Sequence, residues 1–435
     1  MYFGIFADVS HFFFEASLAI LCTLGTAYAW KLARYLKHRR LALAAERQLL
    51  HAPLPPNCDL PHVLIQIPTF NEGALVWRAL AAVTALDWPA DRLQVQVLDD
   101  SNDDSAEIVR AAVDEFRRRG HSVALIQRTA RSGFKAGALK AGLARSNEPF
   151  VAIFDVDYVP QPDFLRLCMR PLLADPGLAF VQARWDFSNP NETFVTRIQQ
   201  YSIDTFAIDQ ASRAWTGSVV DFSGSCGIWR RAAIDAAGGW QDDTLSEDFD
   251  LAYRAQLSGW RGSFLMSVAV PGELPTVLKD WLPQQSRWTK GKGEVVRKTF
   301  SSLSSSKLGL RQKIRFTLHL AESFLTDICG LALASALIFG AIDLTFGKGA
   351  TTGTILLSAI FAVQLLLFQA MVLLSQIEIR HSSLSVELVR VPLIILAFGS
   401  LLIAVGRATI EALLGFKTEF VRTPKRRGYI DNARV

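Results

Sequence analysis

Residues 150–160, FVAIFDVDYVP, decide the fold: an apolar run ends in Asp155, Val156 and Asp157, just before Tyr158, Val159 and a proline. A short and nearly continuous apolar run is typical of a β-strand buried on both faces of a parallel sheet. Ligands of open α/β sheets bind outside the carboxyl ends of the strands, where these two carboxylates lie. Two hard oxygen ligands this close together suit Mg²⁺ or Mn²⁺, which commonly also binds substrate phosphates. The alternative is a pair of ordinary turn residues, because D-x-D alone is a common pattern.

Strands and helices alternate along the chain around this stretch. Further strands are expected at 62–70, 93–100, 122–128 and 178–185, and helices at 74–86, 104–119 and 134–144. This alternation predicts an α/β domain with a mostly parallel sheet and helices on both faces. A dinucleotide-binding domain and a P-loop NTPase are disfavoured, because the first expected strand is not followed by G-x-G-x-x-G and the sequence has no G-x-x-x-x-G-K-[ST].

Half of the residues are hydrophobic, which is high for a soluble protein, and the excess is concentrated outside this domain. Four segments are candidates to cross a bilayer about 30 Å thick: 11–32, 316–344, 355–376 and 391–410. The basic clusters at 31–40 and 422–427 favour a cytoplasmic location for each of these two stretches. The N-terminus would then lie on the outer side of the membrane. Three crossings after residue 313 would instead carry the basic tail outside. Either one segment is re-entrant or interfacial, or one contains two crossings. For residues 11–32 the alternative is a helix lying on the membrane surface.

Charge and cysteine content narrow the class of protein further. The net charge is only +5, and the basic clusters beside apolar segments suit a membrane surface, so no nucleic-acid partner is expected. None of the five cysteines pairs at metal-ligand spacing. They imply no disulfide framework, which makes a reducing compartment the default.

Two more turns bring polar side chains to the same sheet edge as the D-x-D pair. Asn71 and Glu72 follow the first strand, and Asp99 and Asp100 follow the second. A single turn of this kind is commonly a helix N-cap, which is the alternative for each. Three acidic or amide turns at one edge favour a shared ligand site.

Three other stretches have side chains suited to phosphate or proton chemistry. Lys135 lies between glycines at an expected helix start, where a cation and free N–H groups would suit a diphosphate; the alternative is a solvated lysine. Glu247 and Asp248 begin another expected helix, where Asp248 is either an acid that complements the helix dipole or a general base. In QQSRW, Arg287 would bind phosphate while Trp288 stacks on a sugar.

In this order, IPTFNE, LDDSND, FKAGAL, DVD, SED and QQSRW resemble the processive family 2 glycosyltransferases of the cellulose synthase type, over residues 62–298. QARWDF, FSGSCGIWR, AGGWQDDTLSEDFDLAYRAQL and GELP are most similar to the cellulose synthase-like A (mannan and glucomannan synthase) proteins and their bacterial relatives. TEFVRTPKRRG resembles the family's gating-loop motif F-x-V-T-x-K, although Arg422 and Pro424 depart from it and proline stiffens a loop. Ser246 also departs, since the family usually has threonine there.

This resemblance implies a GT-A-like fold and a role for each motif residue. Asp99 and Asp100 would contact the nucleoside, and Asp155 and Asp157 would hold the diphosphate through Mg²⁺ or Mn²⁺, with Asp157 the more direct ligand. Asp248 would deprotonate the acceptor hydroxyl, and the neighbouring Glu247 is also predicted to be catalytic. The other nucleotide-sugar contacts would be Lys135, Gln284, Arg287, Trp288, Thr423 and Lys425.

Together these features predict a membrane-embedded inverting β-glycosyltransferase that extends a polysaccharide from UDP-glucose or GDP-mannose and aids its passage across a bacterial inner membrane. One base without a second, nucleophilic carboxylate suits single displacement. The alternatives are a non-processive glycolipid synthase and an inactive scaffold or transporter. The expected divisions are an anchor (1–40), a linker (41–61), a cytoplasmic catalytic domain (62–298) with interfacial helices at 191–215 and 282–298, a membrane region (299–412) and a cytoplasmic tail (413–435).

Overall fold

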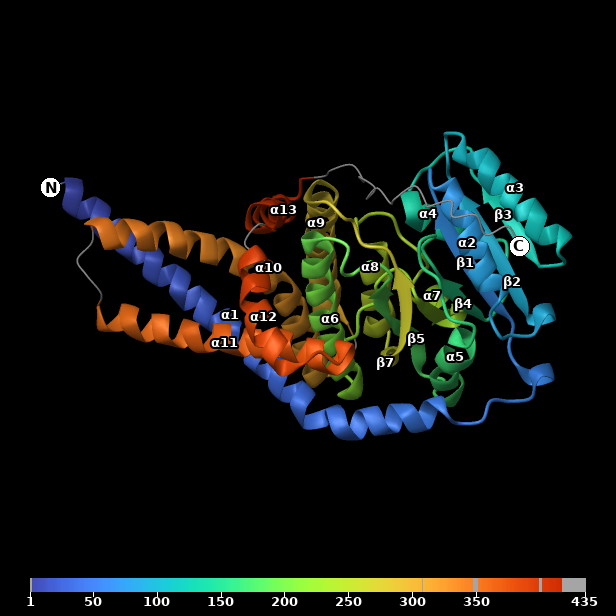
Figure 1. The fold of residues 1–435 in the computed structure, drawn as a ribbon, viewed down its shortest axis with the longest axis horizontal. Coiled ribbons are helices and arrows are strands. Elements are labelled where there is room, and N and C mark those ends of the chain that lie inside the picture. Colours follow the sequence, from blue (N-terminus) through green and yellow to red (C-terminus); the bar gives the residue numbers. More distant parts are fainter. Residues whose placement is uncertain (1, 307, 347–350, 399–400, 417–435) are drawn as a thin grey trace.

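The computed structural model describes residues 2–306, 308–346, 351–398 and 401–416. A globular part lies at one end, and helices project from it toward the N-terminus (Figure 1). The strands are β1 Val63–Thr69, β2 Leu93–Asp99, β3 Val123–Gln127, β4 Phe150–Ile153, β5 Leu178–Phe187, β6 Gly227–Arg230 and β7 Arg261–Gly272. The α-helices are α1 Tyr2–Leu50, α2 Gly73–Thr84, α3 Ser105–Arg118, α4 Phe134–Leu143, α5 Phe164–Ala174, α6 Phe194–Trp215, α7 Arg231–Ala236, α8 Glu247–Leu257, α9 Leu278–Ser305, α10 Leu310–Phe346, α11 Thr352–Arg380, α12 Leu384–Phe398 and α13 Leu402–Leu414.

The described strands form one mixed sheet in the order β3-β2-β1-β4-β6-β5-β7. All neighbouring pairs are parallel except that β6 runs antiparallel to both β4 and β5. The prediction of a mostly parallel α/β sheet is therefore confirmed. The sequence pattern did not reveal β6 and β7, and β4 ends at Ile153, so the D-x-D pair lies in the turn beyond the strand.

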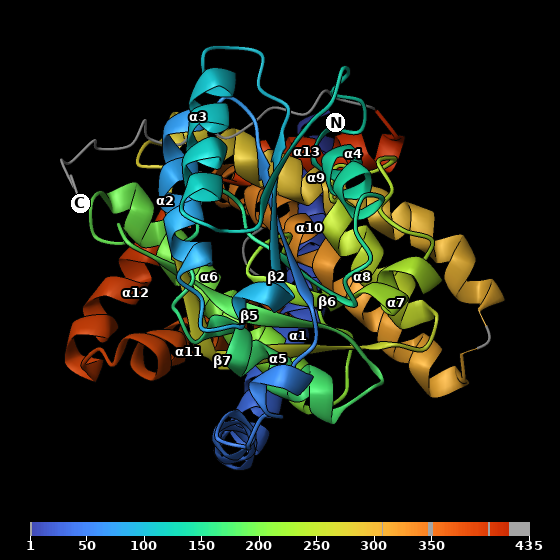
Figure 2. The same ribbon diagram turned by 90° about the vertical axis from the view of Figure 1, so that its right-hand side faces the viewer.

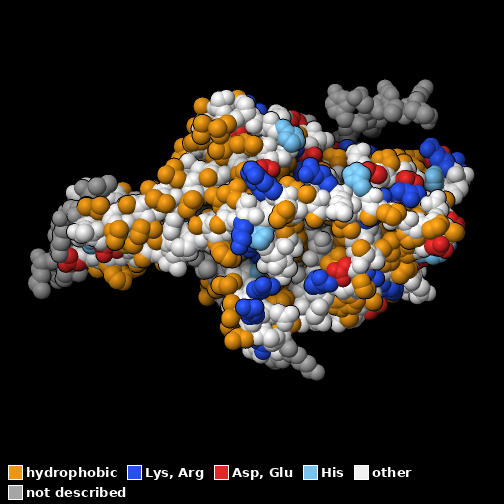
Figure 3. Space-filling model, turned by 90° about the horizontal axis from the view of Figure 1, so that it is seen from below, with side chains coloured by type: hydrophobic (Ala, Val, Ile, Leu, Met, Phe, Trp, Pro, Cys, Tyr) orange, Lys and Arg blue, Asp and Glu red, His pale blue; other side chains and the backbone are white. Residues whose placement is uncertain are grey.

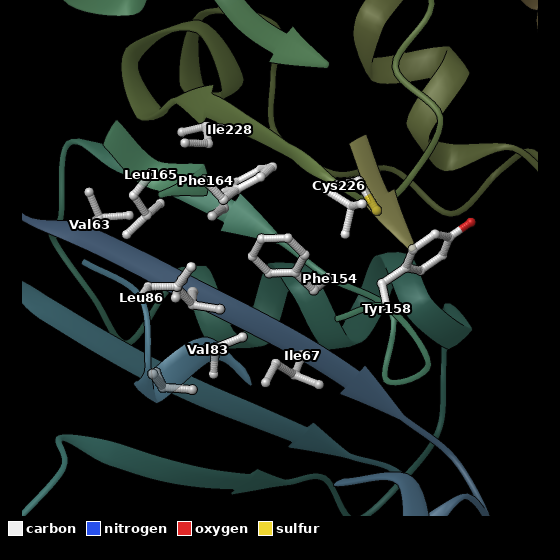
Figure 4. Close-up of a cluster of buried hydrophobic side chains, with 14 of the residues drawn as sticks. Val63, Ile67, Val83, Leu86, Phe154, Tyr158, Phe164, Leu165, Cys226 and Ile228 are labelled. Atoms are coloured by element: carbon white, nitrogen blue, oxygen red, sulfur yellow. The ribbon is translucent and has the colours of Figure 1, made fainter. Parts of the chain in front are cut away.

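Alternating side chains of the central strands build a core on each face of the sheet. Val63, Ile65 and Ile67 of β1 pack with α2, α3 and α5, while Leu64 packs with α4 and the helices of the opposite face. Figure 4 shows the first of these cores, where the rings of Phe154 and Phe164 lie 5.0 Å apart. In Figure 2, α2 and α3 lie on one side of the strands and α4 and α7 on the other, as the sequence predicts.

Helix α6 covers most of the stretch 191–215, whose prediction as an interfacial helix stays a prediction, and many of its side chains are buried. It begins with a capping box between Thr193 and Thr196, and Ile208 and Ala211 are fully buried. Strands β5 and β7 and helices α1 and α11 all contact α6. These contacts come from segments far away in the chain, so the amphipathic pattern alone could not reveal them.

The projection is built from α1, α10 and α11. Ser17 of α1 hydrogen-bonds Ser335 of α10 at 2.8 Å, and the rings of Tyr28 and Phe368 on α11 lie 4.9 Å apart. Among the described residues, α1 and α11 are long and apolar enough to cross a membrane by length and composition. Hydrophobic side chains cover the projection, whereas Lys and Arg gather where it meets the globular part (Figure 3).

One boundary differs from the predicted one. Helix α1 continues to Leu50, so the connection that precedes β1 is shorter than the predicted linker at 41–61. The described parts of the segment 391–410 lie in α12 Leu384–Phe398 and α13 Leu402–Leu414. The segments 316–344 and 355–376 lie within α10 and α11.

Candidate active site

A cavity of about 220 Å³ opens where the carboxyl ends of β1 and β2 and the D-x-D turn meet α4, α6, α8 and α9. The sequence-predicted residues that line it are Asp100, Lys135, Asp155, Asp157, Glu247, Asp248, Gln284, Arg287 and Trp288. Residues almost 190 positions apart in the sequence thus share one cavity. Thr423 and Lys425 lie outside the described residues.

Asp99 does not line this cavity. Its side chain is 2% exposed; Oδ1 accepts a hydrogen bond from the Ser101 amide at 3.0 Å and Oδ2 accepts one from Gln127 Nε2 at 2.9 Å. The carboxylate thus shapes the turn after β2, and its expected contact with the nucleoside stays a prediction. Sequence alone could not separate Asp99 from Asp100, because successive side chains of a strand point to opposite faces and the register was unknown.

Asp100 does line the cavity, and Arg128 fixes its orientation. Arg128 Nε donates to Asp100 Oδ1 at 2.9 Å, and Nη2 donates to the other carboxylate oxygen. The same guanidinium donates to the carbonyls of Ser132 at 2.7 Å and Phe134 at 2.9 Å. Arg128 therefore joins the turn after β2 to the N-terminus of α4, and the sequence motifs gave no signal of this.

Lys135 emerges from the first turn of α4 and reaches the D-x-D turn. Its Nζ lies 2.5 Å from Asp155 Oδ1 and donates to the Gly224 carbonyl at 2.9 Å. Burial alone would lower the pKa of Lys135, but Asp155, Glu247 and Asp248 raise it above the ordinary lysine value. The ammonium therefore stays charged beside the carboxylates, which suits an anionic ligand.

The loop before β6 positions both Asp155 and Lys135. The Asp155 amide donates to Ser225 Oγ at 2.9 Å, while Gly224 supplies the carbonyl that Lys135 binds. Gly224 has φ +79°, and a Cβ there would lie 2.5 Å from Asp248 Oδ2. This explains why FSGSCG has a glycine at that point, since a larger residue would collide with Asp248.

Asp155 and Asp157 differ in how they are presented. The Asp155 side chain is 36% exposed, whereas Asp157 is 1% exposed and its Oδ2 accepts a hydrogen bond from the Glu273 amide at 3.3 Å. No cluster of three or more His, Cys, Asp or Glu side chains suited to a metal occurs among the described residues. The pair still fits a hard cation, because Mg²⁺ is usually held by one or two carboxylates plus substrate phosphates and water.

Glu247 and Asp248 open helix α8 on the wall facing Lys135. Burial, followed by the charge of Asp248, raises the pKa of Glu247 to about 7. Burial also raises the pKa of Asp248, while Lys135 opposes that shift. Helix α9 supports this helix start, because Glu294 accepts a hydrogen bond from the Leu245 amide at 2.8 Å.

Helix α9 carries the QQSRW residues along the cavity. Burial lowers the pKa of Arg287, while Glu247, Asp248 and Asp155 act in the opposite direction. The Trp288 ring lies 6.0 Å from the ring of Trp185 at an angle of 45°. Trp185 of β5, in the motif QARWDF, also lines the cavity, although the sequence indicated no role for it, and its Nε1 donates to the Ser225 carbonyl at 3.3 Å. Helix α6 adds Gln199 and Ser202 to the lining, which the sequence did not indicate.

A family model described as glycosyltransferase like family 2 matches residues 61–291, which contain the sheet and most of the cavity-lining residues. The chain belongs to glycosyltransferase family 2. This confirms the family that the motifs indicated.

Curated relatives indicate which members of the family this chain is similar to. The chain is 41% identical over 263 residues to glucomannan 4-beta-mannosyltransferase 2 of Arabidopsis thaliana, covering 59% of this chain and 48% of that protein. It is 43% identical over 253 residues to glucomannan 4-beta-mannosyltransferase 1 of Oryza sativa subsp. japonica, covering 57% and 48%. The chain thus matches about half the length of these curated relatives.

A solved structure shares the fold. The mannosyltransferase PcManGT from Pyrobaculum calidifontis, in complex with GDP-Man and Mn²⁺, aligns with a TM-score of 0.62 and 19% identity. The alignment covers 92% of this chain and all of that one.

Proposed function

We propose that this protein is a membrane-embedded, inverting β-glycosyltransferase that extends a polysaccharide from a nucleotide sugar. The observation that carries the proposal is the convergence of Asp100, Lys135, Asp155, Asp248 and Arg287 on one cavity at the sheet edge. That cavity pairs a site for an anionic leaving group with a carboxylate for the acceptor.

The leaving diphosphate would be held by Lys135 and Arg287, with Asp155 and Asp157 binding a divalent cation. The cation, when bound, would neutralise charge that develops on the diphosphate. The two side-chain cations would act on the same charge from fixed positions, and such preorganised groups stabilise a transition state without having to reorganise. Asp100, held by Arg128, would orient the nucleoside.

Asp248 would accept the proton of the acceptor hydroxyl. Its raised pKa brings the base closer to neutrality, and a general base is most effective when its pKa lies near the working pH. The deprotonated oxygen would attack the anomeric carbon from the side opposite the diphosphate, which inverts the configuration. Trp288 would supply the apolar face on which the terminal acceptor sugar stacks.

For the donor we propose GDP-mannose. Relatives that are 41% and 43% identical are named as glucomannan mannosyltransferases, and the neighbour of the same fold is described with GDP-Man and Mn²⁺. The same relatives favour a β-linked polysaccharide product over a single lipid-linked sugar. Embedding in a membrane is supported by two helices with sufficient length and apolar composition.

The test is a donor screen on membranes that carry the full chain. GDP-mannose, UDP-glucose and UDP-N-acetylglucosamine are offered with Mn²⁺, and products are sized and digested with linkage-specific hydrolases. A long β-mannan from GDP-mannose is expected. A lipid-soluble product with one sugar would replace the proposal with a glycolipid synthase.

The matched variants are Asp248→Asn and Asp235→Asn. Asp235 pairs with Arg231 on α7, its side chain is 59% exposed, and it does not line the cavity. Loss of a general base typically costs about 10²–10⁴-fold in rate, so Asp248→Asn should nearly abolish transfer while Asp235→Asn retains it. A fully active Asp248→Asn would refute the assignment of the base.

A further inference from the structure

The loop before β6, residues 216–226, holds two residues of the active site in place. Its Gly224 carbonyl accepts a hydrogen bond from Lys135 Nζ at 2.9 Å, and its Ser225 hydroxyl accepts one from the Asp155 amide at 2.9 Å. The loop lies between α6 and β6 and contains neither a helix nor a strand. Its position therefore depends on the groups that bind it.

Asp221 fastens this loop to two helices. Its side chain is buried, its amide donates to Gln210 Oε1 of α6 at 3.1 Å, and Gln210 Nε2 donates to Asp221 Oδ2. The other carboxylate oxygen, Oδ1, lies 2.7 Å from His319 Nε2 of α10. A buried carboxylate is costly unless it is hydrogen-bonded, so α6 and α10 together determine where Asp221 lies.

The ring of His319 is held from three sides. Its Nδ1 faces Arg213 Nη1, and because a guanidinium only donates hydrogen bonds, Nδ1 accepts and Nε2 carries the proton that is donated to Asp221. Tyr253 of α8 stacks on the ring, with the centroids 5.4 Å apart and an angle of 13° between the planes. His319 thus connects α10 with the loop, with α6 and with α8, the helix that carries the proposed base.

The same ionic contacts continue to α1. Arg213 Nε donates to Asp209 Oδ2 at 2.8 Å, and Asp209 Oδ1 accepts a hydrogen bond from Arg34 Nη2 of α1 at 2.6 Å. Arg34, Asp209 and Arg213 are all buried. Two helices of the projection, α1 and α10, are thus joined to the same part of α6, which also carries Gln210.

Only two residues separate Asp221 from Gly224. The first, Phe222, is 1% exposed, and its ring centroid lies 5.2 Å from that of Trp229. The amide of the second donates to Gln182 Oε1 at 2.9 Å. A displacement of Asp221 would therefore reach Gly224, because no flexible segment lies between them to absorb it.

The active site tolerates little movement of this loop. A Cβ at Gly224 would lie 2.5 Å from Asp248 Oδ2 and 3.4 Å from Lys135 Nζ. A misplacement of about 1 Å in a reacting geometry can cost about 10²-fold in rate. Small shifts of the loop should therefore change how the leaving group is bound.

We propose that Asp221 and His319 are positioning residues through which α10 sets the geometry of the loop before β6 and of the donor site. Neither residue lines the active-site cavity, so both act through the two groups that the loop offers to Lys135 and Asp155. For the identity of the donor the inference rests on the proposed function. It adds that a helix of the projection, and not the sheet edge alone, determines how the leaving diphosphate is held.

Two substitutions of His319 separate its hydrogen bonds from its packing. His319→Phe keeps a ring against Tyr253 and removes both hydrogen bonds of the imidazole. His319→Gln keeps one donor and one acceptor, so it can still bind Asp221 and Arg213. The second variant should therefore retain what the first one loses.

The control is Thr205→Val on α6, which removes a different contact between the projection and the catalytic domain. Thr205 is buried, and its Oγ1 lies 3.3 Å from Ser375 Oγ of α11 and donates to the Tyr201 carbonyl at 2.7 Å. Thr205 does not line the active-site cavity. This variant should lower Tm without acting on the loop before β6.

The first measurement is hydrogen–deuterium exchange of the full chain in detergent, followed by mass spectrometry over residues 219–226. His319→Phe should raise the exchange rate of this stretch about 10-fold, because the loop opens more readily without its hydrogen bond to α10. The amides of β1 should exchange as in the parent chain. His319→Gln and Thr205→Val should both leave residues 219–226 close to the parent rate.

Unchanged exchange of residues 219–226 in His319→Phe would overturn the inference. If His319→Phe does not fold, His319→Asn takes its place, because the shorter side chain cannot reach Asp221 and Arg213 together. The same outcomes then apply to His319→Asn.

The second measurement is the Kd of GDP with Mn²⁺, from calorimetry, together with the KM for GDP-mannose. His319→Phe should raise both about 10-fold, which corresponds to the loss of about one hydrogen bond, and His319→Gln should recover most of that loss. Thr205→Val should change neither. A lower Tm with unchanged Kd and KM in His319→Phe would leave the pair a purely structural role and overturn the inference. A parent chain that binds no GDP would refute the proposed donor instead, and the exchange of residues 219–226 would still decide whether α10 sets the loop.

Discussion

Arg128 offers a quantitative test, because its ion pair with Asp100 can be compared with another Arg–Asp pair, Arg261 with Asp175, that is more exposed. The Arg128 and Asp100 side chains are 13% and 6% exposed. The Arg261 and Asp175 side chains are 61% and 33% exposed, and Arg261 Nη2 lies 2.7 Å from both carboxylate oxygens. Arg128→Met and Arg261→Met therefore remove similar ion pairs from different surroundings.

Removing one partner of a buried pair costs about 3–5 kcal/mol, because the other charge is left uncompensated. An exposed pair contributes about 0.2–1 kcal/mol. In a domain of 150–250 residues, 1 kcal/mol shifts Tm by roughly 2–4 °C. Arg128→Met should therefore lower Tm by at least about 6 °C, and Arg261→Met by less than about 4 °C.

The assay is thermal unfolding of the purified chain in detergent, followed by tryptophan fluorescence, together with the KM for the donor. Arg128→Met should also raise KM, since Asp100 and the start of α4 lose their common support. Adding Asp100→Asn to Arg128→Met should recover part of the lost Tm, because no buried charge then remains unpaired. Equal Tm shifts for Arg128→Met and Arg261→Met would refute the reasoning.

Three further predictions concern the catalytic centre. Gly224→Ala should lower kcat by about 10²-fold, because the added Cβ would displace Asp248. The control is Gly120→Ala, at φ +89° with nothing within 4 Å of the added Cβ, which should leave kcat unchanged. Steady-state kinetics of both variants tests this prediction. Since burial raises the pKa of Glu247 to about 7, kcat/KM should rise with pH through neutrality. Glu247→Gln should move that rise to lower pH. A pH profile of kcat/KM that is the same in the variant would show that the pair Glu247 and Asp248 does not control the rise. Chelation with EDTA should abolish transfer, Mn²⁺ should restore it, and Asp155→Asn should raise the Mn²⁺ concentration needed for half-maximal rate, which a metal titration measures.

The raised carboxyl pKa also links stability to pH. A carboxyl whose pKa is higher in the folded chain binds its proton more tightly there than in the unfolded chain. The free energy of unfolding should therefore fall as pH rises from the ordinary carboxyl range toward about 7, the pKa of Glu247. The same argument applies to Asp221, whose pKa burial raises to about 6. Melting temperatures of the Glu247→Gln variant should depend less on pH than those of the parent chain.

Periodicity and turn chemistry were sufficient to predict the α/β domain and the placement of its acidic turns. Strands β1, β2 and β4 are mostly buried on both faces and end in polar turns, so a short apolar run followed by Asp100 or by Asp155 identifies the sheet edge. Parallel strands present their carboxyl ends at one edge, which is why these turns meet. The ordered set of motifs added the family, which the match over residues 61–291 confirms.

Only the tertiary structure decided which of these residues face the cavity. Asp99 and Asp100 are equivalent in the sequence, yet strand register turns one into the fold and the other into the cavity. Arg128 carries no motif signal, because its importance arises from carbonyls and a carboxylate that folding brings to it. The same holds for α12, whose Glu387 is bound by Tyr201 of α6, a contact that the apolar pattern of the segment does not indicate. Local sequence sets which segments are helical or extended, whereas burial and charge pairing depend on contacts between segments far apart in the chain.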